Sequence, residues 1–455
     1  MKGDFTRFTF DPHKRYSRVL MQQGRVQLDA DWNEMVEMQT YFLRTLAADV
    51  IGPHGGPAES FKINDMETAT KQFQNNFAIT PGRYYVDGIL CVNEPSLSEP
   101  FLYASQSGFL EGVFGKLEKN NQYVIYLDVW ERHVTYVEDE HENGIGIREV
   151  ALRRPDTTTR TQIVWQVKCL PSTVTPAPDY KSDDGYKKFL ELLEPSRDDG
   201  TKLTPGKLRA RAIKPTSADN GPCLTSPEAR YRGAENQLYR VEIHDGGELG
   251  KATFKWSREN GAVIFPIEHL EGKSVILAHL GPDDRFGLRP DDWVEIVDDD
   301  YVLQNRAEPL LQIKDIDPDL LQVTLKQSPV PNIGSDSKKH PLLRRWDSAS
   351  VRKVEIPTKN DGWLALEDGV EIHFDGDEKS FFRTGDYWLI PARVATGDVE
   401  WPKERDNQGK LTPAARSPHG VEHHYAPLAL ISLTATDGTV NVDKDYRRAL
   451  KSIGQ

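Results

Sequence analysis

The sequence has few cysteines and no long hydrophobic run, and each absence excludes a class of protein. Cys91, Cys169 and Cys223 are the three cysteines of the 455 residues, and they lie far apart without CxxC or Cys/His finger spacing. We therefore predict neither a disulfide framework nor a zinc site. The most apolar run, residues 426–433, is too short to cross a bilayer, and the N-terminus lacks the apolar segment of a secretory signal. These features predict synthesis in a reducing cytoplasm and no direct membrane insertion.

Positive charge is also in short supply. The chain has 57 Lys and Arg against 70 Asp and Glu, which gives a formal net charge of −13 at pH 7. Because phosphate backbones and anionic lipid surfaces repel such a chain, we predict no nucleic-acid partner. Hydrophobic residues make up 38% of the chain and include 9 Trp, 16 Tyr and 17 Phe, which is enough for packed interiors. At this length, about two to four domains are expected.

Short reactive motifs are absent as well. The sequence has no P-loop, GxGxxG, HExxH or GxSxG motif, so we predict no cofactor, no metal, no catalytic residue and no enzymatic activity. Paired carboxylates for glycoside hydrolysis cannot be recognised among 70 acidic residues, because their spacing is set by the fold. A glycan-degrading enzyme therefore remains a less favoured alternative.

The strongest local signal is a helix near the N-terminus. Asp31 is the predicted N-cap, and Glu34 completes a capping box. Gly52 and Pro53 are the predicted end of the helix, which has about five turns. Apolar residues recur at helical spacing at Trp32, Met35, Val36, Phe42, Leu43, Leu46, Ala47 and Val50. A helix of this kind either packs on its own chain or docks on another subunit, and the sequence leaves both open.

Three aromatic residues precede this helix. Phe5, Phe8 and Phe10 alternate, which is typical of an extended arm that either caps a local core or adds an edge strand to a neighbour. If the segment docks on a partner, the predicted contact residues are Phe5, Phe8, Phe10, Trp32, Met35, Phe42, Leu43 and Leu46.

The rest of the chain has the pattern of β structure. Short β-branched and aromatic runs alternate with turn dipeptides, among them Asp87-Gly88 and the predicted hairpin turn Asn260-Gly261. We predict a mainly β (α+β) fold of several small antiparallel β domains or barrels, with one long N-terminal helix. The predicted segments are an arm and helix (1–56), a β domain (57–172), a Pro-rich linker with a short helix (173–222), a small antiparallel barrel-like domain (223–339) and a C-terminal β domain (340–455).

Side chains that are able to bind ligands are scattered. His423 and His424 are adjacent, and His419 and Asp386 are their candidate companions, but neighbours on a strand face opposite ways and favour packed histidines over a metal site. The carboxylate runs 298–300 and 375–378 are more typical of solvated turns than of calcium sites. Aromatics able to stack on sugar rings, or else to fill the core or a subunit interface, include Trp256, Trp293, Tyr387 and Trp388.

The opening residues, MKGDFTRFTFDPHKRYSRVLMQQGRVQLDADWNE, resemble the start of a bacterial family whose genes tend to lie beside phage-tail-like contractile injection systems. The resemblance continues through FAITPGRYYVDG, ENQLYRVEIHDGG and HHYAPLALISL, so it covers most of the chain. It implies a structural component of such a particle, at the baseplate periphery or fibre-like, that docks through its N-terminal segment.

The resemblance also implies the partners and the place of action. The partners are baseplate, sheath or fibre proteins, and the chain is oligomeric within the assembly. The particle acts inside the cell or is released by lysis. The alternative from the residues themselves is a carbohydrate-binding or cell-surface-binding β protein.

Overall fold

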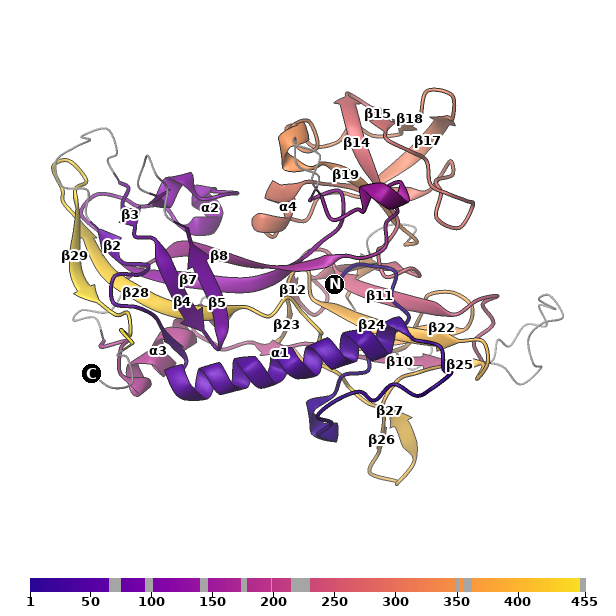
Figure 1. Cartoon of the computed structure of the whole chain (residues 1–455), viewed down its shortest axis with the longest axis horizontal. Coiled ribbons are helices and arrows are strands. Elements are labelled where there is room, and N and C mark those ends of the chain that lie inside the picture. Colours follow the sequence, from indigo (N-terminus) through magenta and orange to yellow (C-terminus); the bar gives the residue numbers. More distant parts are fainter. Residues whose placement is uncertain are drawn as a thin grey trace.

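The computed structural model describes residues 1–64, 75–94, 101–139, 146–172, 178–197, 199–213, 230–348, 352–354 and 362–450 (Figure 1). Strands dominate, and they form several small, almost entirely antiparallel sheets beside one long N-terminal helix. The predicted fold class is therefore confirmed. Cys223 and residues 173–177, 198 and 214–222 of the predicted linker lie outside the described residues. No helix among the described residues has the length and hydropathy needed to span a bilayer.

The long helix, α1, spans Asp29–Ile51. Its N-cap is Leu28, so the capping box predicted from Asp31 is wrong. The first acidic residues instead hold the preceding chain: Asp29 accepts hydrogen bonds from the backbone N and the hydroxyl of Thr6, at 2.8 and 2.6 Å. Gly52 ends the helix as predicted, with a φ of +93° and its N–H donating to the carbonyl of Ala48 at 2.8 Å.

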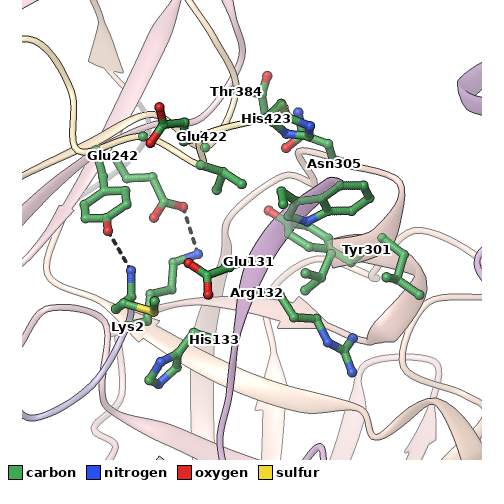
Figure 2. Close-up of a pocket in the computed structure, with 18 of the residues that line it drawn as sticks. Lys2, Glu131, Arg132, His133, Glu242, Tyr301, Asn305, Thr384, Glu422 and His423 are labelled. Carbon is green, nitrogen blue, oxygen red and sulfur yellow. Dashed lines mark hydrogen bonds and ion pairs between the residues drawn. The ribbon is translucent and has the colours of Figure 1, made fainter. Parts of the chain in front are cut away.

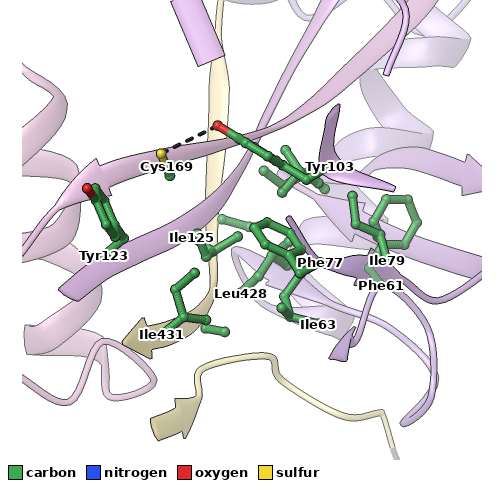
Figure 3. Close-up of a cluster of buried hydrophobic side chains, with 14 of the residues drawn as sticks. Phe61, Ile63, Phe77, Ile79, Tyr103, Tyr123, Ile125, Cys169, Leu428 and Ile431 are labelled. Carbon is green, nitrogen blue, oxygen red and sulfur yellow. Dashed lines mark hydrogen bonds between the residues drawn. The ribbon is translucent and has the colours of Figure 1, made fainter. Parts of the chain in front are cut away.

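The first module is built on a four-stranded sheet in the order β29-β28-β7-β8. Two small sheets, β1-β4-β5 and β2-β3-β6, pack against it, and Figure 3 shows the core between them, from Phe61 and Phe77 to Ile125 and Leu428. The strands are β1 (His54–Gly55), β2 (Ile63–Asn64), β3 (Ala78–Ile79), β4 (Gly82–Val86), β5 (Ile89–Asn93), β6 (Phe101–Leu102), β7 (Gln122–Val134), β8 (Arg160–Pro171), β28 (His424–Leu433) and β29 (Val440–Asp445).

This arrangement corrects the predicted C-terminal domain 340–455. Strand β28 pairs with β7 along its length, so the last strands complete the first module. The physical reason is that buried residues of β28, such as Ala426 and Leu428, fill the same core as Ile125 and Val129 of β7.

The second module has a five-stranded sheet in the order β20-β13-β11-β24-β25, with the three-stranded sheet β10-β22-β21 sharing its core. Because β11 lies between β13 and β24, the predicted boundary at residue 339/340 is also wrong. The strands are β10 (Lys207–Ala212), β11 (Gln237–Ile243), β13 (Thr253–Ser257), β20 (Arg352–Lys353), β21 (Leu364–Ala365), β22 (Val370–Asp375), β24 (Tyr387–Arg393) and β25 (Asp398–Val399), with β9 (Thr204–Pro205), β12 (Gly247–Glu248), β23 (Ser380–Phe382), β26 (Lys403–Arg405) and β27 (Leu411–Pro413) at the edges.

The third module is a closed six-stranded barrel, β14-β15-β18-β17-β16-β19, inserted between strands of the second. A barrel in this part of the chain was predicted, but it starts at Ile264 and needs β19, beyond residue 339. Asn260 and Gly261 have the left-handed φ values expected of them, +50° and +65°, but β13 and β14 on either side pair with different strands, so no hairpin forms there. The strands are β14 (Ile264–Glu271), β15 (Ser274–Leu277), β16 (Trp293–Val297), β17 (Leu311–Asp317), β18 (Gln322–Leu325) and β19 (Leu342–Trp346).

Short helices lie in several connections between strands. The short helix predicted in the linker is α3, and Asp298, predicted in a solvated turn, is buried and caps α4 by accepting a hydrogen bond from the N–H of Tyr301. The helices are α2 (Glu111–Phe114), α3 (Asp183–Leu193), α4 (Asp299–Leu303) and the 3-10 turns Pro12–Lys14, Tyr103–Ser105, Val150–Leu152 and Ser337–Lys339.

Candidate functional site

Helix α1 carries an apolar stripe that faces solvent. Residues 32, 36, 43, 46 and 50 follow helical spacing and share one side of the helix. The opposite side holds the buried Met38 and Ala30. Each residue of the stripe is exposed: Trp32 by 55%, Val36 by 43%, Leu43 by 62%, Leu46 by 48% and Val50 by 69%. We call these five residues the α1 stripe.

The remaining predicted docking residues divide between surface and interior. Phe42 is 66% exposed beside the α1 stripe and Phe8 is 40% exposed. Met35 is half-buried. Phe5 and Phe10 are also half-buried, because Phe5 packs edge-on against His133 and Phe10 packs against Tyr41. The aromatic residues at positions 5 and 10 therefore mainly attach the N-terminal segment to its own chain.

Residues 12–28, which we call the arm, join these aromatics to α1 and loop around the start of that helix (Figure 1). The side chains of Tyr16, Leu20, Met21, Val26 and Leu28 are all exposed, Val26 by 81%. Residues 16–27 form no hydrogen bond or ion pair with the rest of the described chain, so their backbone donors and acceptors are open apart from the Arg25 N–H, which donates to the Gln22 carbonyl. The arm has Lys14, Arg15, Arg18 and Arg25 but no acidic residue.

A cavity of about 310 Å³ lies where the three modules meet. Figure 2 shows Glu131, Arg132 and His133 of β7, with Glu242 of β11 and Tyr301 of α4, around it. Other walls come from the N-terminal residues, from β13, β16 and β19, and from residues 419–424.

Strand alternation explains why the cavity is charged. In β11, Tyr239, Val241 and Ile243 fill the core of the second module, which turns Arg240 and Glu242 to the opposite face. Lys255 of β13 lies opposite Glu242 in register. In the barrel, Val294 and Ile296 point inward, so Glu295 of β16 points outward beside its cross-strand partner Arg344 of β19. Two charged sheet faces therefore meet, and both are buried.

Two carboxylates organise this cluster. Glu295, fully buried, accepts hydrogen bonds from Lys255 Nζ at 2.7 and 2.8 Å and from Trp346 Nε1 at 3.0 Å. Glu242 is 3.0 Å from Lys2 Nζ, 3.7 Å from Lys255 Nζ and 2.5 Å from Arg240 Nε. Burial raises the pKa of each carboxyl, but the attraction of these cations outweighs burial, and both pKa values are lowered. Both glutamates are therefore ionised at neutral pH.

Some buried polar atoms at the cavity have no partner among the described residues. Arg344 is 4% exposed and donates to the carbonyl of Gly261, but its Nε has no acceptor and its guanidinium forms no ion pair there. Nδ1 of His244, which lies 3.9 Å from a Glu295 oxygen, and Nε2 of His133 also have no hydrogen-bond partner among the described residues. Burial lowers the pKa of Arg344 and of both histidines. The cavity therefore has hydrogen-bonding capacity that the chain leaves unused.

Comparison with known protein families identifies the family of this chain. The model of a protein family, described as a family of unknown function (DUF6519), matches residues 1–202 and 199–438. The chain belongs to the DUF6519 family. Searches of the curated proteins and of the solved structures found no match for this DUF6519 chain.

Most of the aromatic residues predicted as ligand-binding surface are buried in the DUF6519 chain, which corrects that prediction. Trp256 and Trp388 are 6% and 0% exposed, and both belong to the core of the second module. Tyr387 is 8% exposed and packs with Leu238 beneath Phe5. For these three residues the alternative in which the aromatics fill the core is therefore confirmed.

Trp293 is half-buried and lies in a second, more open cleft of about 820 Å³ between the barrel and the second module. The same cleft contains Glu367, Arg258 and Asp347. Burial raises the pKa of Glu367 to about 7, although Arg258 Nη2 donates to it at 2.7 Å.

Each of the two adjacent histidines is held by a different carboxylate. His423 Nδ1 is 2.7 Å from Asp128 and His424 Nδ1 is 2.9 Å from Asp87. His419 stacks on Tyr387. Within the described residues no group of three or more His, Cys, Asp or Glu is placed to hold a metal ion.

Sequence reasoning missed the buried charged cluster. Arg240, Lys255, Glu295 and Arg344 alternate with apolar residues, which is the pattern of a sheet face in water. The second module and the barrel each contribute charges of both signs, so no charge pattern in the sequence indicates that these two faces meet.

Proposed function

We propose that this protein is a structural component of a phage-tail-like contractile particle, attached to a neighbouring subunit through the arm and the α1 stripe. The observation that carries the proposal is the apolar, exposed and unpartnered character of these two adjacent segments. The sequence resemblance to a family encoded beside such particles supports the particle context. The acidic body of the chain suits a crowded assembly, because like charge opposes non-specific association.

The exposed apolar area is of the size that a stable interface requires. Five arm residues, the α1 stripe and Phe42 are 43–81% exposed. With about half of each large side chain in water, their combined area is on the order of 1,000 Å². One partner of a stable protein interface contributes about 800 Å². The arm and the α1 stripe together therefore offer enough area for a single specific contact.

The chemistry of the arm indicates the kind of surface that it binds. Open backbone donors and acceptors over residues 16–27 favour the addition of this segment to the free edge of a β-sheet. Lys14, Arg15, Arg18 and Arg25 favour an edge flanked by acidic side chains. The proposed partner is therefore another particle subunit that presents an acidic sheet edge beside an apolar groove for the α1 stripe.

The test is recovery of the tagged full-length chain from its native host, followed by electron microscopy of whatever particle comes with it. The variant Leu43→Glu/Leu46→Glu places two charges on the α1 stripe. Fully burying a leucine contributes about 2 kcal/mol, and each of these two has about half of that still to gain. Losing both contacts therefore costs about 2 kcal/mol and weakens docking by roughly 30-fold. Because both leucines are exposed in the free chain, its free energy of unfolding should change by less than about 1 kcal/mol.

The matched control is Leu320→Glu/Leu411→Glu, which changes two leucines that are 61% and 55% exposed elsewhere on the surface. The control should recover the particle as the unchanged chain does, whereas the stripe variant should not. Recovery of the unchanged chain without sheath, tube or baseplate proteins contradicts the particle assignment. Equal recovery by the stripe and control variants contradicts docking through α1.

A carbohydrate-binding role is a second candidate, and the cleft beside Trp293 is the observation that favours it. An aromatic ring next to ionised and hydrogen-bonding side chains is the usual composition of a sugar site. Glycan-array binding that is lost in Trp293→Ala supports this role. Sugar release that is lost in Glu367→Gln would instead point to a glycan-degrading enzyme.

A further inference from the structure

The charged cluster around the cavity has more cations than anions. Four cationic side chains, Lys2, Arg240, Lys255 and Arg344, share two carboxylates, Glu242 and Glu295. All of these except Lys2 are at most 4% exposed. Burying an unpaired charge is strongly unfavourable, and proteins normally pair it or leave it in water.

Other charges at the cavity are already neutralised. Arg132 pairs with Asp299 at 2.9 Å, and Lys168 pairs with Asp128 at 2.7 Å. Glu138 lines the cavity and lowers the electrostatic cost of Arg344 from a distance. Its carboxylate is held by the N–H and hydroxyl of Thr135, and it forms no ion pair with the four cations among the described residues. Glu138 and Glu422 line the cavity without an ion pair to these four cations among the described residues, so Arg344 lacks a carboxylate in contact with it although the lining as a whole is not strongly positive.

Of the four cations, Arg344 is the one without an ion-pair partner among the described residues. It is opposite Glu295 in register, but that carboxylate is taken up by Lys255, Trp346 and Tyr301. The guanidinium is a planar fork suited to two oxygens of one anion, and its Nε is buried without an acceptor. A ligand oxygen group at this position would satisfy it.

We propose that the cavity is a binding site for a phosphate monoester, with the phosphate group held by Arg344 and by the adjoining cations Lys255 and Lys2. A phosphate monoester carries about two negative charges at neutral pH and would face Arg344, Lys255 and Lys2 together. A cavity of about 310 Å³ is at the lower end of the range for small-molecule sites, so the ester is a small one.

The rim of the cavity gives a route for such a ligand. The side chains of Glu131, His423 and Lys2 are 29%, 21% and 24% exposed, so solvent reaches the wall between β7 and the N-terminal residues. Figure 2 places Glu131 and His133 of β7 on one side and Glu242 on the other. Lys2 lies between the rim and the buried carboxylate.

The test is isothermal titration calorimetry of the full chain with inorganic phosphate and with phenyl phosphate, up to about 10 mM so that millimolar affinities are detected. Sodium chloride at matched ionic strength and succinate are the comparison ligands. We expect one site that binds phosphate and its ester, and no binding of chloride. Arg344→Met should weaken binding by about tenfold or more, since a charged hydrogen-bond donor is lost. Arg289→Met, at an arginine that is 62% exposed in the other cleft, should change binding by less than twofold.

The same variant separates a binding role from a structural one. If Arg344 serves a ligand, Arg344→Met removes an unpaired buried charge, and without phosphate it should melt at the same temperature as the unchanged chain or higher. Phosphate should raise the melting temperature of the unchanged chain and of Arg289→Met, but not of Arg344→Met. The proposal is overturned if phosphate neither binds nor stabilises the unchanged chain, if Arg344→Met binds phosphate equally well, or if succinate binds and phosphate does not. If Arg344→Met fails to fold, the arginine is structural and the proposal also fails.

Discussion

Replacing Glu295 by glutamine should destabilise the protein more than any surface change. Glu295 is fully buried and is the nearest carboxylate to Lys255, itself 1% exposed. The amide of glutamine keeps the shape of the side chain and one oxygen acceptor, but it loses the charge. Lys255, Arg240, Arg344 and Lys2 would then share Glu242 alone.

The size of the effect follows from these contacts. Removing one partner of a buried ion pair costs about 3–5 kcal/mol. Glu242 lies 3.7 Å from Lys255 Nζ and offsets part of the loss, so the lower end, about 3 kcal/mol, is expected. The exposed Glu271, 87% of whose side chain is in water, provides the matched control, and Glu271→Gln should change stability by less than about 0.5 kcal/mol.

Guanidinium denaturation followed by tryptophan fluorescence measures this difference, since Trp346 contacts Glu295 directly. The same denaturation experiment at acidic pH provides a second test. The pKa of Glu295 is lowered from its ordinary 4.5 by Lys255 against the opposing effect of burial, so its contribution is complete above that value and is lost as the pH falls further. The difference in the free energy of unfolding between the unchanged chain and Glu295→Gln should therefore become smaller below about pH 4.5. A gap under about 1 kcal/mol at pH 7 would refute the view that the cluster depends on this carboxylate.

Two further predictions concern the N-terminal region. Burial lowers the pKa of Lys2 to about 8, so between pH 8 and 10.5 the unfolded chain binds more protons than the folded chain. The free energy of unfolding should therefore rise with pH over this window, by at most about 3 kcal/mol. Denaturation measured across this pH range should show the rise for the unchanged chain and not for Lys2→Met. A Cβ at Gly88, whose φ is +77°, would lie 2.1 Å from the Arg44 carbonyl oxygen, so Gly88→Ala should cost about 2 kcal/mol and speed amide hydrogen exchange in α1. Gly272→Ala, at φ +58° with nothing within 4 Å, should cost about 1 kcal/mol and leave α1 exchange unchanged; equal exchange in both variants would contradict a role for this contact.

The sequence predicts what depends on neighbouring residues. Helical spacing from Trp32 to Val50 and the glycine at 52 located α1, and the even series of short strands indicated a barrel. The predicted N-cap was three residues late, because Asp29 and Glu34 bind Thr6 and Thr9, contacts that no local pattern encodes. Helix α1 packs on its own chain through Ala30 and Met38, whereas Leu43 and Leu46 on the other side stay exposed, and a docking partner for them stays a prediction.

What the sequence does not predict is which strands meet. Alternation in β11 and β13 shows that Arg240 and Lys255 share the face opposite the core, but it does not show that a barrel covers that face. The same ambiguity applies to Trp256 and Trp388, which face the core, although the pattern also allows a free surface. Strand pairing between distant segments depends on tertiary contacts, and it decides both the module boundaries and the burial of the charged cluster.

Because β7 pairs with β28, the first module cannot be completed until the last strands have been synthesised. About 290 residues separate Val134 from His424, and a ribosome adding about 5–20 residues per second needs roughly 15–60 seconds to cover that distance. Throughout this interval one hydrogen-bonding edge of β7 is unpaired, and the core around Ile125 and Val129 lacks the buried residues of β28, such as Ala426 and Leu428. The nascent chain must keep that edge from pairing with other polypeptides until its last strands emerge, so rapid overexpression should favour aggregates in which the first module is incomplete.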